Sequence, residues 1–122
     1  MISNKKFSLN IYKAGIIIQA RTGSKRFPKK ILCKINNKTV LEILIDRLLV
    51  YFNKEDIYVA TTKKSKDDII LETIKKKKIN FFRGSENDVL SRFTECAKIN
   101  NLHKIIRLTS DCPLIDPELI IK

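Results

Sequence analysis

The chain has 122 residues, 43% of them hydrophobic, which is enough for one domain with a buried core, so wholesale disorder is not expected. Lys and Arg number 25 against 13 Asp and Glu, and this net charge of +12 favours polyanionic partners unless it only reflects frequent lysine throughout the chain. The three cysteines include no Cys-x-x-Cys pair, which argues against a disulfide framework and against a zinc site. No apolar run suits a signal peptide or a membrane span. We therefore expect a cytoplasmic protein.

The first half of the chain predicts a strand, a basic loop and a helix. Residues 1–13 have mixed polarity and are expected to form an N-terminal extension, with the domain occupying residues 14–122. Residues 14–20 are apolar and β-branched, as in a strand buried on both faces. Residues 21–30 are polar and basic and contain Gly and Pro, so they predict a loop. Residues 40–52 carry apolar side chains at spacings of three and four, which indicates an amphipathic helix.

The second half continues the alternation. The later strands are expected at residues 56–61, 79–83 and 104–109. Residues 67–78 predict a helix, since acidic residues open the segment and lysines close it, as the helix macrodipole favours. Ser85 is expected to cap a helix over residues 86–99. The core face expected for that helix consists of Val89, Leu90, Phe93, Cys96 and Ala97.

The order of these elements predicts the fold class. Alternating strands and helices give a three-layer α/β/α fold with a mostly parallel sheet. Ligands of such sheets bind outside the carboxyl ends of the strands. That rule selects the basic loop after the first strand, Arg83 at the end of the third, and Asp111 after the fourth.

The basic loop has the chemistry that phosphates need. Arg21, Lys30 and the basic residues between them supply fixed cations, while Gly23 and Ser24 supply accessible backbone and a hydroxyl. The loop lacks the Gly-Lys-Ser ending of a Walker A motif and the Gly-x-Gly-x-x-Gly pattern of dinucleotide binders. By composition it is either a phosphate site or a solvated loop, and its position after a buried strand favours the phosphate site.

Each of the other polar residues near the strand ends can be interpreted as functional or as structural. Asp111 is placed where one carboxylate can hold Mg²⁺ against a triphosphate, although a turn aspartate before Pro113 is the alternative. Arg83 and Arg92 are either surface arginines or part of the cleft, and Arg83 lies at the carboxyl end of its strand. His103, the only histidine, precedes a strand at the opposite edge, which predicts a structural role.

Several blocks, in order, resemble one family. Residues 17–32 read IIQARTGSKRFPKKIL. They resemble the signature of the cytidylyltransferases that make CMP-activated sugar acids, in particular the spore-coat polysaccharide synthesis F-type proteins. The blocks that follow in family order are VAT at 59–61, FRGSENDVLSRF at 82–93 and RLTSDCPLIDP at 107–117. The resemblance covers nearly the whole chain after residue 13.

The resemblance implies a fold and a reaction. The fold would be the Rossmann-like nucleotide-diphospho-sugar transferase fold, truncated to its N-terminal part. The reaction would join CTP to a sugar or sugar acid and release pyrophosphate, with Mg²⁺ as cofactor, for surface polysaccharide biosynthesis. The resemblance is also compatible with a homodimer.

The same resemblance implies roles for individual residues. Arg21, Lys30 and Asp111 would be catalytic, and Asp111 would hold the metal ion. The nucleotide would contact Ala20, Arg21, Gly23, Ser24, Lys30, Arg83 and Arg92.

Two departures from the family pattern leave an alternative open. Lys29 stands where the family usually has Gly, which adds bulk beside the phosphates. Relatives are considerably longer, and their remaining part supplies much of the sugar pocket. An inactive remnant that only binds a nucleotide or a partner is therefore the alternative to an enzyme. The net charge also suggests a nucleic-acid-binding module, but this sequence lacks the aromatic stacking platforms and the clustered basic face that such modules use.

Overall fold

The computed structural model describes residues 8–9, 12–21, 34–35, 38–85 and 87–109. Its main feature is a four-stranded sheet in the order β5-β4-β1-β6, in which every neighbouring pair is parallel. The bounds of these strands are β1 Ala14–Gln19, β4 Ile57–Thr62, β5 Asn80–Gly84 and β6 Lys104–Thr109. All four had been predicted, with ends that differ by one residue at most.

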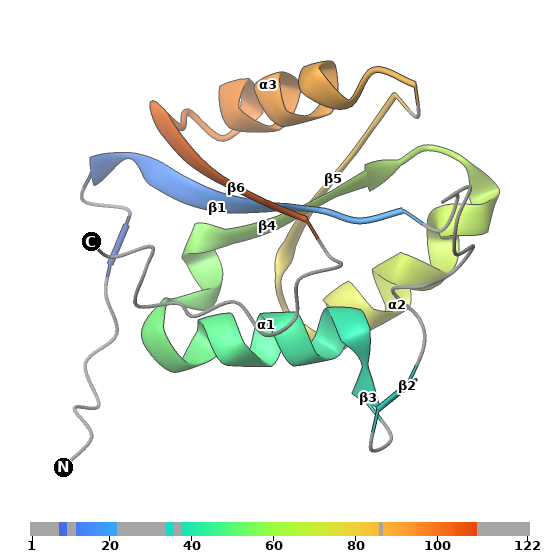
Figure 1. Cartoon of the computed structure of the whole chain (residues 1–122). Helices are drawn as coiled ribbons and strands as arrows, with labels where there is room; N and C mark the ends of the chain where they lie inside the picture. The colour runs from blue at the N-terminus through green and yellow to red at the C-terminus, as the bar shows by residue number, and fades with distance from the viewer. Residues whose placement is uncertain (1–7, 10–11, 22–33, 36–37, 86, 110–122) are drawn as a thin grey trace, which may run out of the picture.

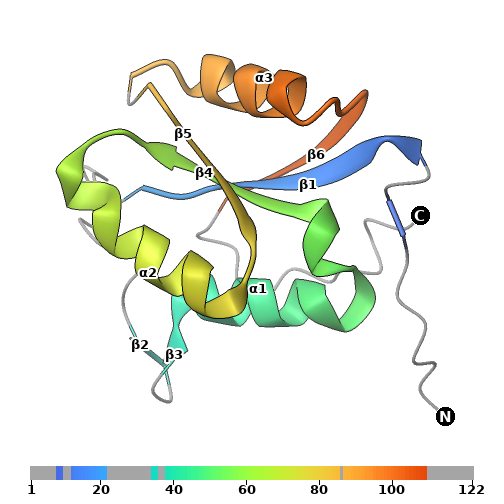
Figure 2. The same cartoon turned by 180° about the vertical axis from the view of Figure 1, so that it is seen from behind.

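Three helices and two short helical turns connect the strands. The α-helices are α1 Val40–Tyr51, α2 Asp68–Lys77 and α3 Val89–Ile99. The 3-10 turns are η3 Lys54–Asp56 and η4 Ser65–Asp67. Helices α1 and α2 cover one face of the sheet and α3 covers the other, as Figures 1 and 2 show from opposite sides. The predicted three-layer α/β/α architecture is confirmed.

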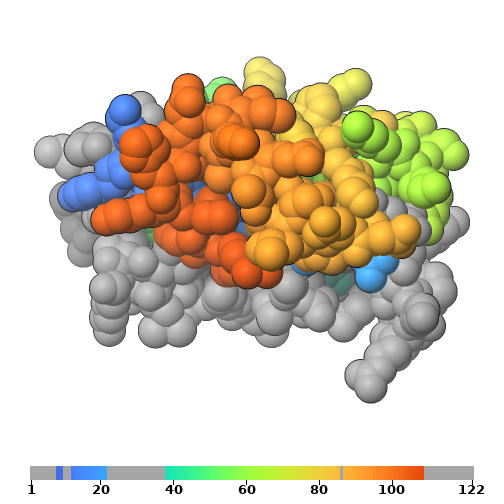
Figure 3. Space-filling model, turned by 90° about the horizontal axis from the view of Figure 1, so that it is seen from above, coloured from blue at the N-terminus to red at the C-terminus, as the bar shows by residue number. Residues whose placement is uncertain are grey.

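The alternation of side chains along β1 explains why the sheet needs helices on both faces. Ile16 and Ile18 belong to the larger core, which also includes most buried residues of α1 together with Ile70 and Ile74 of α2. Ile17, between them, belongs to a second core with Phe93 and Cys96 of α3. All three isoleucines are 0% exposed, as a central parallel strand requires. Seen from the α3 side, this helix lies across the sheet with β6 along one margin (Figure 3).

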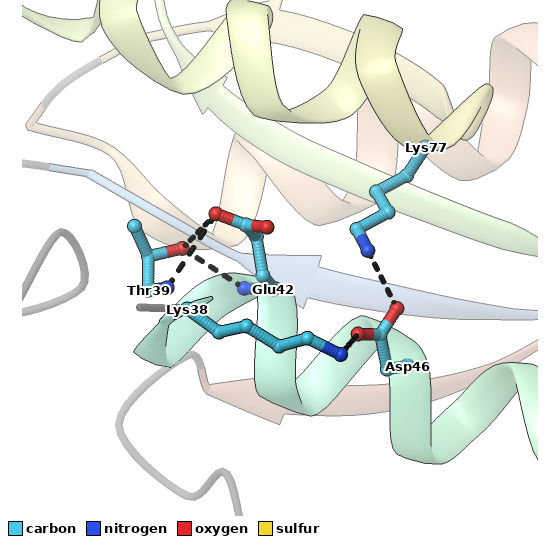
Figure 4. Close-up of polar contacts among 5 residues, drawn as sticks. All are labelled: Lys38, Thr39, Glu42, Asp46 and Lys77. Atoms are coloured by element: carbon cyan, nitrogen blue, oxygen red, sulfur yellow. Dashed lines mark hydrogen bonds and ion pairs between the residues drawn. The ribbon is translucent and has the colours of Figure 1, made fainter. Parts of the chain in front are cut away.

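Helix α1 begins at a capping box. The Thr39 hydroxyl accepts a hydrogen bond from the Glu42 N–H at 3.1 Å, and the Glu42 carboxylate accepts one from the Thr39 N–H at 3.4 Å (Figure 4). The core face of the helix is the predicted one, with spacings of three and four, and Phe52 ends it as a buried C-cap residue. The buried residues of α1 are Val40, Leu41, Leu44, Ile45 and Leu48.

The start of α3 differs from the prediction. Asp88, not Ser85, is the N-cap residue, and its carboxylate accepts a hydrogen bond from the Ser91 N–H at 3.0 Å. The Ser85 hydroxyl instead accepts the Asp88 N–H at 3.2 Å, in the turn before the helix. Starting at Val89, the helix turns Phe93 and Cys96 toward the sheet and leaves Leu90 64% exposed, so Leu90 was wrongly assigned to the core.

Two further features were not predicted. A short antiparallel hairpin, β2 Lys34–Ile35 with β3 Lys38–Thr39, precedes α1. Leu9, within the expected N-terminal extension, is buried in the larger core, and its N–H donates to the Asp56 carboxylate at 2.9 Å. This part of the extension therefore packs against the domain. None of the helices in the described part of the chain is long and apolar enough to cross a membrane.

Candidate functional site at the carboxyl edge of the sheet

The sheet has a topological switch point between β1 and β6. From β1 the chain passes along the α1 and α2 face through β4 to β5, and α3 then returns it across the other face to β6. The register pairs Gln19 with Thr109, so β1 and β6 end side by side. In open parallel sheets, ligands bind at the carboxyl edge at such a point.

The end of β1 leads directly into the basic loop. Ala20 is fully buried, and its N–H donates to the Ala60 carbonyl at 3.0 Å, which ties the end of β1 to β4. Arg21, the first residue of the loop, is half-buried beside it. The other predicted loop residues, Gly23, Ser24 and Lys30, lie outside the described residues.

Arg83 is at the end of β5, and protein atoms engage all three nitrogens of its guanidinium. Nε donates to the Thr62 carbonyl at 2.7 Å, and Nη2 donates to the Lys64 carbonyl at 2.9 Å. Nη1 is 2.8 Å from Oδ1 of Asp68. The Lys63 N–H also donates to the Gly84 carbonyl at 3.2 Å. The arginine thus joins the turn between β4 and α2 to the end of β5.

The same turn holds a buried carboxylate. Asp67 is 0% exposed, and its Oδ2 accepts a hydrogen bond from the Thr62 hydroxyl. The Lys64 N–H donates to the Thr62 hydroxyl at 3.3 Å, and the Asp67 N–H donates to the Lys64 carbonyl at 3.0 Å. These bonds satisfy polar groups that would otherwise be buried at a cost. They also give the turn one defined conformation.

Arg92 lies beneath the end of β5 rather than on the surface. It is 0% exposed, and its Nη1 donates to the Ser85 carbonyl at 3.0 Å. Gly84 makes room for it, since a Cβ there would lie 2.9 Å from Cγ of Arg92 and 2.8 Å from the Phe82 ring. Direct nucleotide contact by Arg83 or Arg92 stays a prediction, and their described hydrogen bonds go to backbone carbonyls.

The predicted metal ligand, Asp111, lies outside the described residues. Within the described ranges, His, Cys, Asp and Glu form no group of three that suits a metal ion. In the described turn between β4 and α2, the carboxylates of Asp67 and Asp68 are bonded to the Thr62 hydroxyl and the Arg83 guanidinium. The magnesium prediction rests on Asp111.

Sequence reasoning did not identify the roles of Thr62, Asp67 and Asp68. The two aspartates were interpreted only as acidic residues that favour a helix start. The signal available was their position, immediately after a strand whose carboxyl end faces the candidate site. His103, by contrast, is exposed just before β6 at the opposite edge, and its backbone N–H donates to the Lys13 carbonyl at 2.7 Å.

Comparison with known proteins agrees with this geometry. A family model described as cytidylyltransferase matches residues 15–122. The chain belongs to the cytidylyltransferase family. The Bacillus subtilis spore coat polysaccharide biosynthesis protein SpsF is 40% identical over 108 residues, which are 85% of this chain and 45% of that protein. The resemblance predicted from the sequence is confirmed.

Two solved structures share the fold of this cytidylyltransferase chain. A cytidylyltransferase from Leptospira borgpetersenii has a TM-score of 0.84 and 42% identity, covering 88% of this chain and 45% of the other. A CMP:2-keto-3-deoxy-manno-octonic acid synthetase complexed with CTP has a TM-score of 0.70 and 25% identity, covering 88% and 44%. The chain therefore spans somewhat less than half the length of these relatives.

Proposed function

We propose that this chain carries the CTP site of an enzyme that transfers CMP to a sugar or sugar acid and releases pyrophosphate. The observation that carries the proposal is the switch point, where β1 and β6 end side by side and the basic loop begins at Arg21. The relative solved with CTP bound has the same fold over 88% of this chain, which supports CTP as the nucleotide.

The proposed roles follow from charge and position. Arg21, Ser24 and Lys30 bind the triphosphate, and Arg21 and Lys30 offset the charge that develops on the departing pyrophosphate. Backbone amides of the loop near Gly23 seat the nucleotide, whereas the Ala20 N–H is already bonded to the Ala60 carbonyl, so Ala20 serves by fixing where the loop begins. All of these residues belong to one segment of the chain, which starts at the end of β1, where the Ala20 N–H bonds to β4.

Asp111 is the residue that would hold magnesium. It follows Thr109 by two residues, so the chain allows it at most about 7 Å from the end of β6, which adjoins β1. When bound by Asp111, magnesium would supply positive charge against the phosphates and would help to orient the α-phosphate toward a sugar hydroxyl. Magnesium needs few protein ligands because it retains several waters, so one carboxylate from this half of the site is sufficient.

A thermal-shift measurement tests this proposal. CTP with Mg²⁺ should raise the unfolding midpoint by several degrees, since a ligand at a hundred times its Kd stabilises by about 2.7 kcal/mol. Lys30→Ala and Asp111→Ala should each abolish the shift. Lys76→Ala removes an exposed lysine from α2 and should keep the shift, which controls for the loss of charge. An unchanged midpoint at millimolar CTP would contradict the proposal.

A further inference from the structure

We infer that Arg83 is a positioning residue, which orders the turn between β4 and α2 and through it the start of the basic loop. The inference rests on the proposed CTP site and concerns how the fold holds that site. It assigns Arg83 a role different from the direct nucleotide contact expected from the sequence.

The geometry of the guanidinium carries the argument. An arginine that binds phosphate presents its planar fork toward the ligand. Here each of the three nitrogens already has a protein acceptor within 2.9 Å, namely the carbonyls of Thr62 and Lys64 and the Asp68 carboxylate. The Arg83 side chain is only 24% exposed.

Of the two carbonyls that Arg83 binds, that of Thr62 ends β4, which pairs with β5 as far as Gly84, and that of Lys64 lies in the turn beyond the strand. The backbone of the turn also bonds to β5, because the Lys63 N–H donates to the Gly84 carbonyl. Inside the turn, the Thr62 hydroxyl donates to buried Asp67, which fixes the path of the chain from β4 into η4. Arg83 therefore connects an ordered turn to a strand at the outer edge of the sheet.

Strand β4 transmits this order to the candidate site. It lies between β5 and β1, and the Ala60 carbonyl accepts the Ala20 N–H at 3.0 Å. Ala20 precedes Arg21, where the basic loop begins. Displacing the end of β4 would therefore displace the first residues of the loop, because closely packed elements transmit strain rather than absorb it.

Binding of CTP to three folded variants distinguishes positioning from direct contact. Arg83→Gln and Arg83→Lys should weaken CTP binding by similar factors, about three- to thirty-fold. The reason is that one lysine ammonium cannot replace a fork that spans two carbonyls and a carboxylate. Asp68→Asn should not tighten binding, although it releases Arg83 from its ion pair. All affinities are measured by calorimetry at a temperature where each variant is fully folded, so that a loss of stability alone changes no affinity.

Lys77→Ala is the matched control, since it removes an ion pair at the far end of α2 and should leave CTP affinity unchanged. Arg83→Lys with wild-type affinity would overturn the inference, because the fork would then not be needed. Asp68→Asn with tighter binding would overturn it in favour of direct phosphate contact. Wild-type protein that does not bind CTP would instead refute the proposed function. If Arg83→Gln does not fold, Arg83→Lys and Asp68→Asn still decide between the two roles.

Discussion

Cys96 shows how the fold controls the chemistry of a single residue. Its side chain is 0% exposed in the core between α3 and the sheet, beside Ile17 and Phe93. Burial raises the pKa of the Cys96 thiol from 9.0 to about 11, although the Asn100 amide contacts the sulfur at 3.9 Å and opposes that rise. The thiolate is the reactive form of cysteine, so the buried thiol should be inert near neutral pH.

We therefore expect Cys96 to react with a disulfide reagent mainly through the unfolded state. In a Cys33→Ser/Cys112→Ser background at pH 8, the folded chain should hold about a hundredfold less Cys96 thiolate than the urea-unfolded chain, as two pKa units require. The absorbance of the released thiol measures both rates, and the chain without any cysteine supplies the blank. Equal rates in the folded and unfolded chains would contradict the burial.

At the scale of elements, Asp46 connects three parts of the chain. Its carboxylate is 3.0 Å from the Lys38 ammonium of β3 and 2.8 Å from the Lys77 ammonium in the last turn of α2 (Figure 4). Burial acts to raise the pKa of Asp46, but hydrogen bonds and charges from Lys77 and Lys38 outweigh it and lower the pKa below 3.8. Helix α1 is thereby joined to the hairpin and to α2.

Asp46→Asn should lower the free energy of unfolding by about 1 kcal/mol at pH 7, the upper range for an ion pair at a surface. The contribution of a carboxylate with a lowered pKa is complete above 3.8 and disappears as the pH falls through the folded value. Urea unfolding at pH 7 and near pH 2.5 measures the difference, with exposed Glu95→Gln as the control. A loss of the same size at both pH values would show that the ion pairs do not cause it.

Elements with a clear period were predictable, and those without one were not. The buried run of β1 and the apolar face of α1 follow from spacing, and both lie where expected. The hairpin before α1 has two residues in each strand, too few for any periodicity. The start of α3 depends on which residue caps the helix, and the structure shows that Asp88, rather than Ser85, is the N-cap residue.

At the scale of the whole molecule, the main feature is the length of this chain compared with the length of its relatives. The chain spans about 45% of the relatives that it matches, and β6 has a described neighbour only on its β1 side. We propose that the remaining part of those relatives supplies most of the sugar site.

The 122-residue chain should accordingly bind CTP but release no pyrophosphate above the CTP-only blank when sugar acids are added. An enzyme-coupled pyrophosphate assay over a panel of sugar acids, with Mg²⁺ and millimolar CTP, measures this directly. Release that depends on one sugar acid and is lost in Asp111→Ala would show that this chain is a complete enzyme. Binding without release supports a nucleotide-binding module.

The sequence alone determined the order of strands and helices, the three-layer class and the family, because apolar periodicity and ordered motif blocks are local properties. It also indicated the edge of the sheet at which the CTP site is proposed. Only the tertiary structure decided what Arg83 and Arg92 contact, because their acceptors, mostly backbone carbonyls, lie in other segments that no side-chain pattern reveals. The same holds for Leu9, which is buried in the larger core and whose N–H bonds to Asp56, 47 residues away.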